Sequence, residues 1–372
     1  MKIGTIKGIE IKLHISTLLI VALVGFYVAS FYNSLIPEAT ISDLLTVGLA
    51  NGVLILGSIL VHELLHSIYA QRYGLKVREI ELYVFGGASK IEEEPKTPKE
   101  EIIIAAVGPL SSLVIGFSLI ALLFLPINYS AILAVTFFYG GFSNILLGIF
   151  NFLPGFPMDG GRVLRSILWK RRGDLVSATR TAAKVGNAFG YGFIAYGFFE
   201  IFFFGSFGGL WLILIGSFLN NAARSEYLET VNQMKLSNIN VESMISPRNI
   251  PIPFKMLIRD AIRDYFMLYK VDYFPVVQNH EIVGILHIDD IRRVPLDQHS
   301  STIVGYVMRP LSGFPSIHNE DSGKEAYKQL KSIEDFPPIL VVKGSQDEHI
   351  MGFISKEDLA YALRFAGPST RD

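Results

Sequence analysis

Cysteine is absent from the 372 residues of the chain. Its absence excludes disulfide scaffolds, cysteine nucleophiles, iron–sulfur clusters and zinc sites built on thiolates. Charge is scarce as well, because only 18% of the residues are charged, against about 25% in an average soluble domain. The 33 basic and 34 acidic residues nearly cancel, so no excess of positive charge points to nucleic acid as a partner. Any metal ion must be held by His, Asp or Glu.

Long apolar stretches accompany this shortage of charge. Half of the residues are hydrophobic, the mean hydropathy is +0.40, and a membrane-spanning helix needs about 20 apolar residues. Six stretches approach or exceed that length: Leu13–Phe31, Val47–Ala70, Ile102–Pro126, Ala131–Phe150, Ala188–Phe204 and Phe207–Ala223. We therefore expect an α-helical polytopic protein of the cell membrane, with about six transmembrane helices in the lipid bilayer.

The loop charges predict how these helices are oriented. Lys and Arg accumulate in the cytoplasmic loops of membrane proteins. They are frequent in the connections 72–99 and 162–184 and absent from 37–42, 127–130 and 205–206. The first apolar segment lacks a cleavage signature, so we interpret it as a retained anchor rather than a signal peptide. The alternation predicts that both the N-terminus and the C-terminus are cytoplasmic.

The second apolar segment contains the sequence His62-Glu63-Leu-Leu-His66. Ionisable residues inside a membrane helix are energetically expensive and usually mark function. Residues four apart lie on one face of an α-helix, so both imidazoles can reach one metal ion, and imidazole is a good zinc ligand. Glu63 is rotated by about 100° and can act as a general base. Alternatively, the two histidines bond neighbouring helices or belong to a proton path.

A third ligand is available at Asp159, within the sequence N-F-L-P-G-F-P-M-D-G-G-R at 151–162. This segment follows the fourth apolar stretch on the predicted cytoplasmic side, where His66 also lies. Its two prolines prevent a helix from continuing and its two glycines permit a tight backbone path, so the carboxylate can turn inward to a metal. Alternatively, Asp159 is a capping or turn residue next to Arg162.

Together the two motifs resemble those of the site-2 protease family of intramembrane zinc metalloproteases. The resemblance implies that His62, His66 and Asp159 bind one Zn²⁺ per chain and that Glu63 is the catalytic base and acid. It also suggests a catalytic role for Asn151, as a donor to the oxyanion or to the substrate backbone. The implied activity is that of a zinc-dependent endopeptidase, which cuts a transmembrane protein substrate within or near its helix in regulated intramembrane proteolysis.

A strand-forming segment, 79–88, comes after the predicted metal-binding helix and ends near Phe85, Gly86 and Gly87. The family resemblance implies a small β-hairpin or sheet near the active site, whose edge binds extended substrate at these three residues. Unwinding a substrate helix in lipid exposes backbone groups at several kcal/mol each, and pairing with an edge strand offsets that cost. The alternative is an ordinary surface hairpin.

The last third of the chain contains an internal repeat. Segment 241–247 recurs at 304–310, segment 272–277 at 335–341, and segment 283–291 at 351–359. Short apolar strands alternate there with helix-like stretches, which predicts a soluble α/β module in two copies, about 241–295 and 304–365. We therefore expect a transmembrane domain at 1–225, a linker at 226–240 and a tandem domain at 241–372.

This repeat resembles a pair of CBS modules. The resemblance implies a cytosolic regulatory pair that binds an adenine nucleotide such as ATP or AMP. The second copy keeps the pattern Gly352-x-x-Ser355-x-x-Asp358, whose last two residues contact a ribose in such modules. The first copy has His287 in place of the hydroxyl residue. The alternative is a purely structural pair, or one that joins two chains in a homodimer.

Two rival functions remain open. A transporter or metal channel also places His and Asp in the membrane, but its polar residues are expected at several depths, whereas here they gather at one. A nucleotide sensor with a simple membrane anchor gives no reason for two histidines and an aspartate at matching depth. The sequence favours the protease, with a nucleotide at the CBS-like pair regulating it through the linker.

Overall fold

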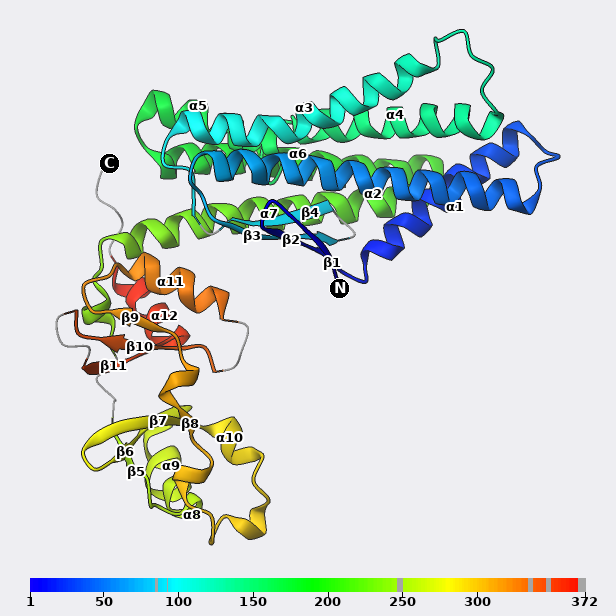
Figure 1. Ribbon diagram of the computed structural model, residues 1–372. Coiled ribbons are helices and arrows are strands. Elements are labelled where there is room, and N and C mark those ends of the chain that lie inside the picture. Colours follow the sequence, from blue (N-terminus) through cyan, green and yellow to red (C-terminus); the bar gives the residue numbers. More distant parts are fainter. Residues whose placement is uncertain (84–85, 92, 246–249, 334–336, 346–348, 367–372) are drawn as a thin grey trace. The chain divides into compact units, whose positions relative to one another are not determined.

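The computed structural model describes residues 1–83, 86–91, 93–245, 250–333, 337–345 and 349–366 (Figure 1). The chain forms two compact units, Met1–Glu229 and Thr230–Asp372. Each unit has hydrophobic clusters of its own.

Helices dominate the first unit. They are α1 (Thr17–Leu35), α2 (Ile41–Arg72), α3 (Pro98–Leu122), α4 (Ala131–Asn151), α5 (Asp159–Arg172), α6 (Leu175–Phe204) and α7 (Gly208–Ser237). Among the described residues, α1, α2, α3 and α4 are long and apolar enough to cross a membrane. The last two predicted segments form the end of α6 and the start of α7. Glycine, tyrosine and asparagine dilute their hydropathy, and the predicted total of about six spans is not confirmed.

Polar residues and glycine set the ends of these helices. Thr40 and Thr97 form capping boxes with Asp43 and Glu100 at the starts of α2 and α3, which satisfies N–H groups that the first turn leaves free. At the other end of α5, Gly173 adopts a φ of 71°, a left-handed conformation that glycine reaches without steric cost. These local signals are why the helices extend beyond the apolar stretches themselves.

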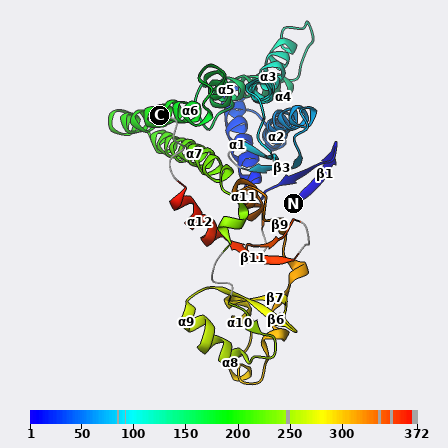
Figure 2. The ribbon, with the colours of Figure 1, turned by 90° about the vertical axis from the view of Figure 1, so that its left-hand side faces the viewer.

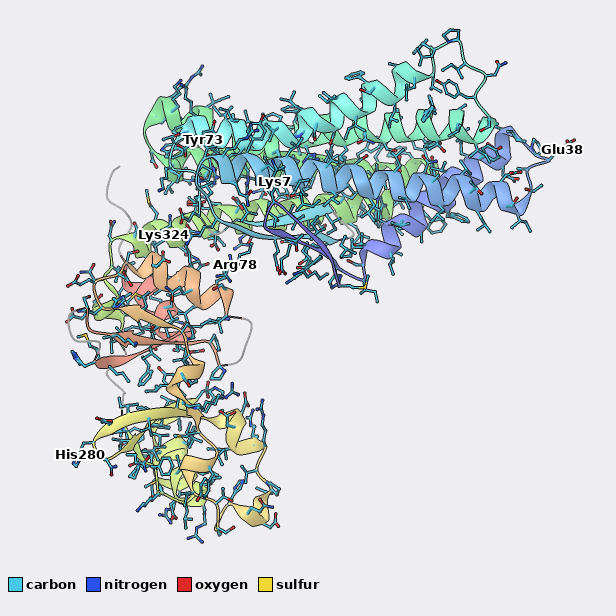
Figure 3. All side chains as sticks on the ribbon, viewed as in Figure 1. Lys7, Glu38, Tyr73, Arg78, His280 and Lys324 are labelled. Atoms are coloured by element: carbon cyan, nitrogen blue, oxygen red, sulfur yellow. The ribbon has the colours of Figure 1, made fainter. Side chains whose placement is uncertain are left out.

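The outward faces of the apolar helices carry large hydrophobic side chains. Exposed examples are Leu19, Phe26, Leu49, Val114 and Phe142. Glu38 lies in the turn before α2 and Tyr73 directly after that helix, so these polar groups mark its opposite ends (Figure 3). Large exposed apolar surfaces are rare on soluble monomers, and these are the surfaces of a membrane protein.

A four-stranded sheet lies beside α2 (Figures 1 and 2). Its strands are β1 (Lys2–Ile6), β2 (Ile9–Leu13), β3 (Val77–Tyr83) and β4 (Gly86–Ile91), in that order. The pair β2–β3 is parallel and the other pairs are antiparallel. Ile9, Ile80 and Leu82 are buried in one cluster with Ile59 of α2, which attaches the sheet to that helix. The strand-forming segment predicted at 79–88 overlaps β3 and the start of β4, whereas β1 and β2 were not predicted.

Helix α3 contacts α2, α4 and α5. Small residues allow this close packing. A Cβ built on Gly116 would lie 2.8 Å from the carbonyl oxygen of Gly141 in α4, and one on Gly148 of α4 would lie 3.0 Å from the carbonyl oxygen of Pro109. Helix backbones in membranes approach through such small residues.

The second unit contains two small sheets with short helices. One sheet has the order β5 (Ile252–Pro253), β6 (Tyr273–Gln278), β7 (Glu281–His287), β8 (Arg309–Pro310), and the other has β11 (Ile350–Ser355), β10 (Ile339–Lys343), β9 (Ser316–His318). The helices are α8 (Ile258–Ala261), α9 (Met267–Tyr269), α10 (Ile288–Arg292), α11 (Gly323–Ser332) and α12 (Lys356–Phe365), with a π turn at Ile262–Phe266 and 3-10 turns at Val241–Met244, Leu296–Gln298, Val304–Tyr306 and Leu311–Gly313. The predicted α/β domain is therefore present in this part of the chain.

The two repeats exchange their first segments. Val241 and Met244, at the start of the first repeat, pack in the core of the second, and Val304 from the second packs in the core of the first. The predicted linker, 226–240, is largely the end of α7, whose Leu236 is fully buried in the core of the second repeat. Neither repeat has a complete core by itself.

Candidate metal centre

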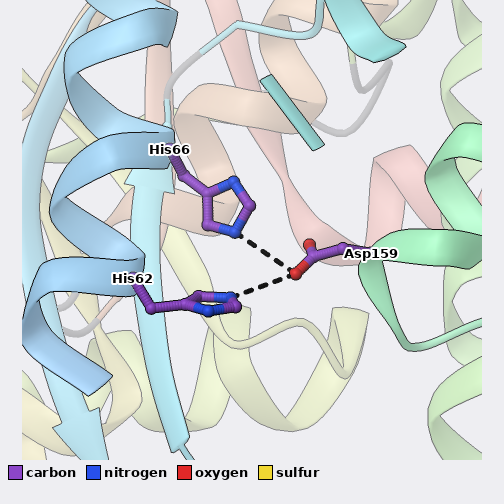
Figure 4. A group of neighbouring side chains, drawn as sticks. All are labelled: His62, His66 and Asp159. Carbon is purple, nitrogen blue, oxygen red and sulfur yellow. Dashed lines mark hydrogen bonds and ion pairs between the residues drawn. The ribbon is translucent and has the colours of Figure 1, made fainter. Parts of the chain in front are cut away.

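His62, His66 and Asp159 converge on one point in the first unit (Figure 4). The Nε2 atoms of both imidazoles lie 3.2 Å from the same carboxylate oxygen, Oδ2 of Asp159. All of the ligand atoms lie within 4.8 Å of one another. The two histidines come from successive turns of α2, and Asp159 is the first residue of α5. The three residues chosen from the sequence are therefore brought together.

The other nitrogen of each imidazole is held by α3. Nδ1 of His66 donates a hydrogen bond of 2.6 Å to the carbonyl oxygen of Ile104, and Nδ1 of His62 pairs with Oγ of Ser112 at 2.9 Å. A carbonyl can only accept, so Nδ1 of His66 carries a proton, and Nε2 is the nitrogen that faces Asp159. Such outer partners fix the tautomer and orientation of metal-binding histidines.

Gly108 of α3 provides the space in front of the imidazoles. A Cβ built on this residue would overlap Nε2 of His66 and lie 2.7 Å from Nε2 of His62. The space at this glycine therefore borders the atoms that would bind a metal. Two imidazoles and one carboxylate are also the donor set of many catalytic zinc sites, which keep a further position open. The residues present fit a zinc ion.

The segment before Asp159 follows a tight path. A Cβ on Gly160 would overlap the carbonyl oxygens of residues 152 and 153, and one on Gly186 of α6 would overlap the carbonyl oxygen of Phe156. Phe156 is buried, and its N–H donates to the carbonyl of Ala182 in α6 at 3.2 Å. The predicted helix break is present, and contact with α6 fixes its course.

Glu63 follows His62 in α2 and lies close to strand β4. A Cβ built on Gly87 would overlap Cγ of Glu63 and lie 2.8 Å from its Cδ. Gly86 pairs with Tyr83 and Gly87 with Leu82 in the β3–β4 ladder. Of the three predicted substrate-binding residues, Gly87 thus adjoins the candidate general base, and Phe85 lies outside the described residues.

The remaining predicted site residues make local contacts. Asn151, the last residue of α4, donates through Nδ2 to the carbonyl of Leu147 at 2.9 Å, so its amide is used within its own helix. Its catalytic role stays a prediction. Ser112 and Gly108 were not predicted as parts of the site. The signal that could have identified them is a serine and a Gly-Pro pair within an otherwise apolar segment.

The two motif aspartates of the second unit have different partners. Asp358 accepts from the N–H of Ser355 at 2.9 Å and from its hydroxyl at 2.8 Å, which caps α12. Asp290, at the same position of the first repeat, is buried and accepts from Nε and Nη2 of Arg309 at 3.0 and 2.8 Å. A guanidinium therefore already engages Asp290.

Two protein families match the chain. The profile of peptidase family M50 matches residues 51–195, and the CBS domain profile matches residues 241–297. Rip3 of Mycobacterium tuberculosis, whose name assigns it to the zinc metalloproteases, is 30% identical over 361 residues, which cover 96% of this chain and 91% of Rip3. The chain belongs to peptidase family M50.

Two proteins of an archaeon are also similar, one along nearly the whole chain and one along part of it. A zinc metalloprotease of Methanocaldococcus jannaschii is 29% identical over 368 residues, which cover 98% of this chain and 96% of that protein. A solved site-2 protease from the same organism has 29% sequence identity and a TM-score of 0.43, and it covers 61% of this chain and 94% of its own. The family resemblance inferred from the two motifs, together with a CBS domain, is confirmed.

Proposed function

We propose that the protein is an intramembrane zinc metalloprotease that hydrolyses peptide bonds of transmembrane protein substrates. One observation carries this proposal: two imidazoles and a carboxylate meet beside a glutamate and a sheet edge, within an apolar helical unit. Family membership supports hydrolysis over a metal channel or a simple membrane anchor.

His62, His66 and Asp159 would hold the zinc ion through two Nε2 atoms and Oδ2. When bound, zinc supplies Lewis acidity, which lowers the pKa of water and polarises a carbonyl. The protein's own contribution is orientation. Ser112 and the Ile104 carbonyl hold the imidazole rings, so little reorganisation is needed when the ion binds.

Glu63 would move the proton. It is one residue from His62 on α2 and is partly exposed, so it can accept a proton from the attacking water and pass it to the leaving amine. Its contact with Gly87 places this carboxylate beside β4. The proton acceptor therefore lies between the metal ligands and the strand on which we place the substrate.

We place the substrate along β4, in an extended conformation. β4 is the last strand of its sheet as described, with β3 on one side. An added strand satisfies the backbone groups of an unwound substrate helix. Gly86 and Gly87 would let that backbone come close to Glu63. Phe85 and Asn151 keep the substrate and oxyanion roles that the family resemblance implies.

We also propose that the chain crosses the membrane six times, with both termini in the cytoplasm. Helices α6 and α7 approach through glycine, since a Cβ on Gly190 would lie 2.8 Å from the carbonyl oxygen of Gly216 and one on Gly197 would lie 2.5 Å from that of Gly209. Exposed side chains of the two helices and of the turn between them are large and apolar: Tyr196, Phe202, Phe203, Phe207, Trp211 and Leu214. Lipid suits this surface better than water.

We further propose that the second unit regulates the protease. One adenine nucleotide would bind at Ser355 and Asp358, and a second chain would be its partner in a homodimer. Because Arg309 engages Asp290, the second repeat is the better place for the ribose. Titration of ATP and AMP against the purified chain and its Asp358→Asn variant tests this assignment. Binding that is absent, or unchanged by the substitution, would remove it.

Replacing Glu63 with Gln tests the protease itself. The amide keeps the size of the side chain but cannot accept the proton, so we expect cleavage of tagged single-span membrane proteins to fall at least about a hundredfold. Zinc content should be unchanged, whereas His66→Ala should lose it. Glu38→Gln, in the exposed turn before α2, is the matched control. Normal cleavage by Glu63→Gln would contradict the mechanism.

A further inference from the structure

A second cluster of buried charge lies outside the metal centre. Glu101 of α3 is 3% exposed and Arg165 of α5 is 4% exposed. Nε of Arg165 donates to Oε1 of Glu101 at 2.7 Å, and Nη2 donates to the same oxygen. The hydroxyl of Ser166 donates to Oε2 at 2.6 Å. Both carboxylate oxygens of Glu101 are therefore bonded to one turn of α5.

Such a pair requires an explanation other than stability. Taking two charges out of water costs several kcal/mol per ion, and a well-packed apolar pair is often as stable. A charged pair with several directed hydrogen bonds does, however, fix distance and angle more narrowly than an apolar contact. The arrangement therefore points to a need for defined geometry between α3 and α5.

Arg165 also contacts the other side of the turn that bears Asp159. Its guanidinium carbon lies 5.2 Å from the ring centroid of Phe156, in a cation–π contact. Phe156 precedes Asp159 by three residues and Arg165 follows it by six. One side chain thus holds the segment on both sides of the metal-binding carboxylate, while Nη1 faces Glu226 of α7 at 3.6 Å.

Glu101 belongs to the same helix that orients the histidines. Along α3, Glu101 binds Arg165, Ile104 binds His66, Gly108 leaves room for both imidazoles, and Ser112 binds His62. These positions recur at three or four residues, which places them along one face of the helix. Both halves of the metal centre, α2 and α5, are therefore held against one face of α3.

From this arrangement we infer that Glu101 and Arg165 are positioning residues, which keep Asp159 at bonding distance from the metal held by His62 and His66. The inference rests on the proposed zinc site but adds residues that touch neither metal nor substrate. Glu101 and Arg165 affect zinc binding only through the position of Asp159. The two imidazoles keep their own bonds to Ile104 and Ser112 when the pair is broken.

Zinc affinity, measured with the full chain against a competing chelator, tests this inference. We expect Glu101→Gln to weaken zinc binding about tenfold, the low end of the effect seen for outer-shell partners of metal ligands. In an Asp159→Asn background the same substitution should have no further effect, because its route to the metal is gone. The visible spectrum of bound Co²⁺ should also differ between Glu101→Gln and the unsubstituted chain, and it should not change further in the Asp159→Asn background.

Two further variants keep the result interpretable. Ser166→Ala removes one hydrogen-bond donor to Glu101 and leaves both charges, so it should weaken zinc binding less than Glu101→Gln does. It replaces that variant in the test if Glu101→Gln fails to fold. Glu79→Gln changes another buried carboxylate, which pairs with Lys12 in the sheet, and should leave zinc affinity unchanged. Unaltered zinc binding in both Glu101→Gln and Ser166→Ala, or an equal loss in the Asp159→Asn background, would overturn the inference. Absence of zinc binding by the unsubstituted chain would instead overturn the proposed function with it.

Discussion

Gly108 shows how a single residue limits what the metal centre can hold. A methyl group there would overlap Nε2 of His66 and crowd Nε2 of His62, and the His66 ring cannot easily turn away because Ile104 holds its other nitrogen. We therefore expect Gly108→Ala to weaken zinc binding by at least about tenfold, as loss of an outer-shell contact does. Chelator competition on the purified chain measures this change.

Gly57 offers the matched control for that substitution. It lies in α2, near the histidines in sequence, and a Cβ built on it meets nothing within 4 Å. Gly57→Ala should leave zinc affinity unchanged and favour the helix by roughly 0.5–1 kcal/mol. Equal zinc affinities for the two alanine variants would show that the space at Gly108 is not used by the ion.

The contents of this site could be predicted from the sequence only in part. His62 and His66 lie one helical turn apart, so periodicity alone places them on one face, and the broken segment near Asp159 indicates an inward turn. The bonds to Ser112 and Ile104 depend on how α3 packs against α2. No local pattern encodes that packing, so the helix that orients the metal ligands could be found only from the structure.

Among the elements, β4 carries the next prediction. A Cβ on Gly87 would overlap Cγ of Glu63, and Leu82 is the other close neighbour. Gly87→Ala should therefore displace the candidate base without touching the imidazoles of His62 and His66. Because a positioned general base contributes about 10² to 10⁴ in rate, we expect cleavage to fall at least about tenfold at unchanged zinc affinity.

A glycine in another strand separates this effect from general damage to the sheet. Gly4 lies in β1, and a Cβ built on it meets nothing within 4 Å. Gly4→Ala should therefore cleave tagged membrane proteins at the normal rate. If Gly87→Ala does so as well, Glu63 does not depend on this strand for its position.

The elements themselves were predictable where their signals are local. The four apolar helices lie close to the segments read from the sequence, and the predicted strand-forming segment 79–88 overlaps β3 and β4. Strands β1 and β2 were missed because each has five residues, and the partner of β2 is β3, which begins at Val77. Pairing across such a distance depends on the burial of Ile9 and Ile80 against α2, which short sequence patterns cannot show.

At the scale of the whole molecule, one helix belongs to both units. Ala223 of α7 packs with Phe156 and Ala182 in the first unit, and Leu236 packs in the core of the second. The sequence predicts two domains from the change in composition. It does not predict that a helix continues through the linker, because polar residues there are equally typical of a loop.

The second unit should also respond to pH through His287. This side chain is 4% exposed and accepts the N–H of Asp289 at the start of α10. Burial lowers the pKa of His287 below its ordinary value of 6.5, against the opposing attraction of Asp289, Asp290 and Asp272, while Arg309 lowers it further. The unfolded chain therefore takes up a proton at a higher pH than the folded chain does.

Acid should accordingly destabilise this unit. The contribution of neutral His287 is complete above about pH 6.5 and is lost as the pH falls through that value, at no more than about 1.4 kcal/mol per pH unit for one proton. Urea unfolding of residues 230–372 at pH 7.5 and 5.5 measures the loss. His287→Ser keeps a helix cap of the kind that Ser355 supplies to α12 but cannot titrate, so its stability should fall less between the two pH values. An equal fall in both proteins would show that His287 takes up its proton as readily in the folded chain as in the unfolded one.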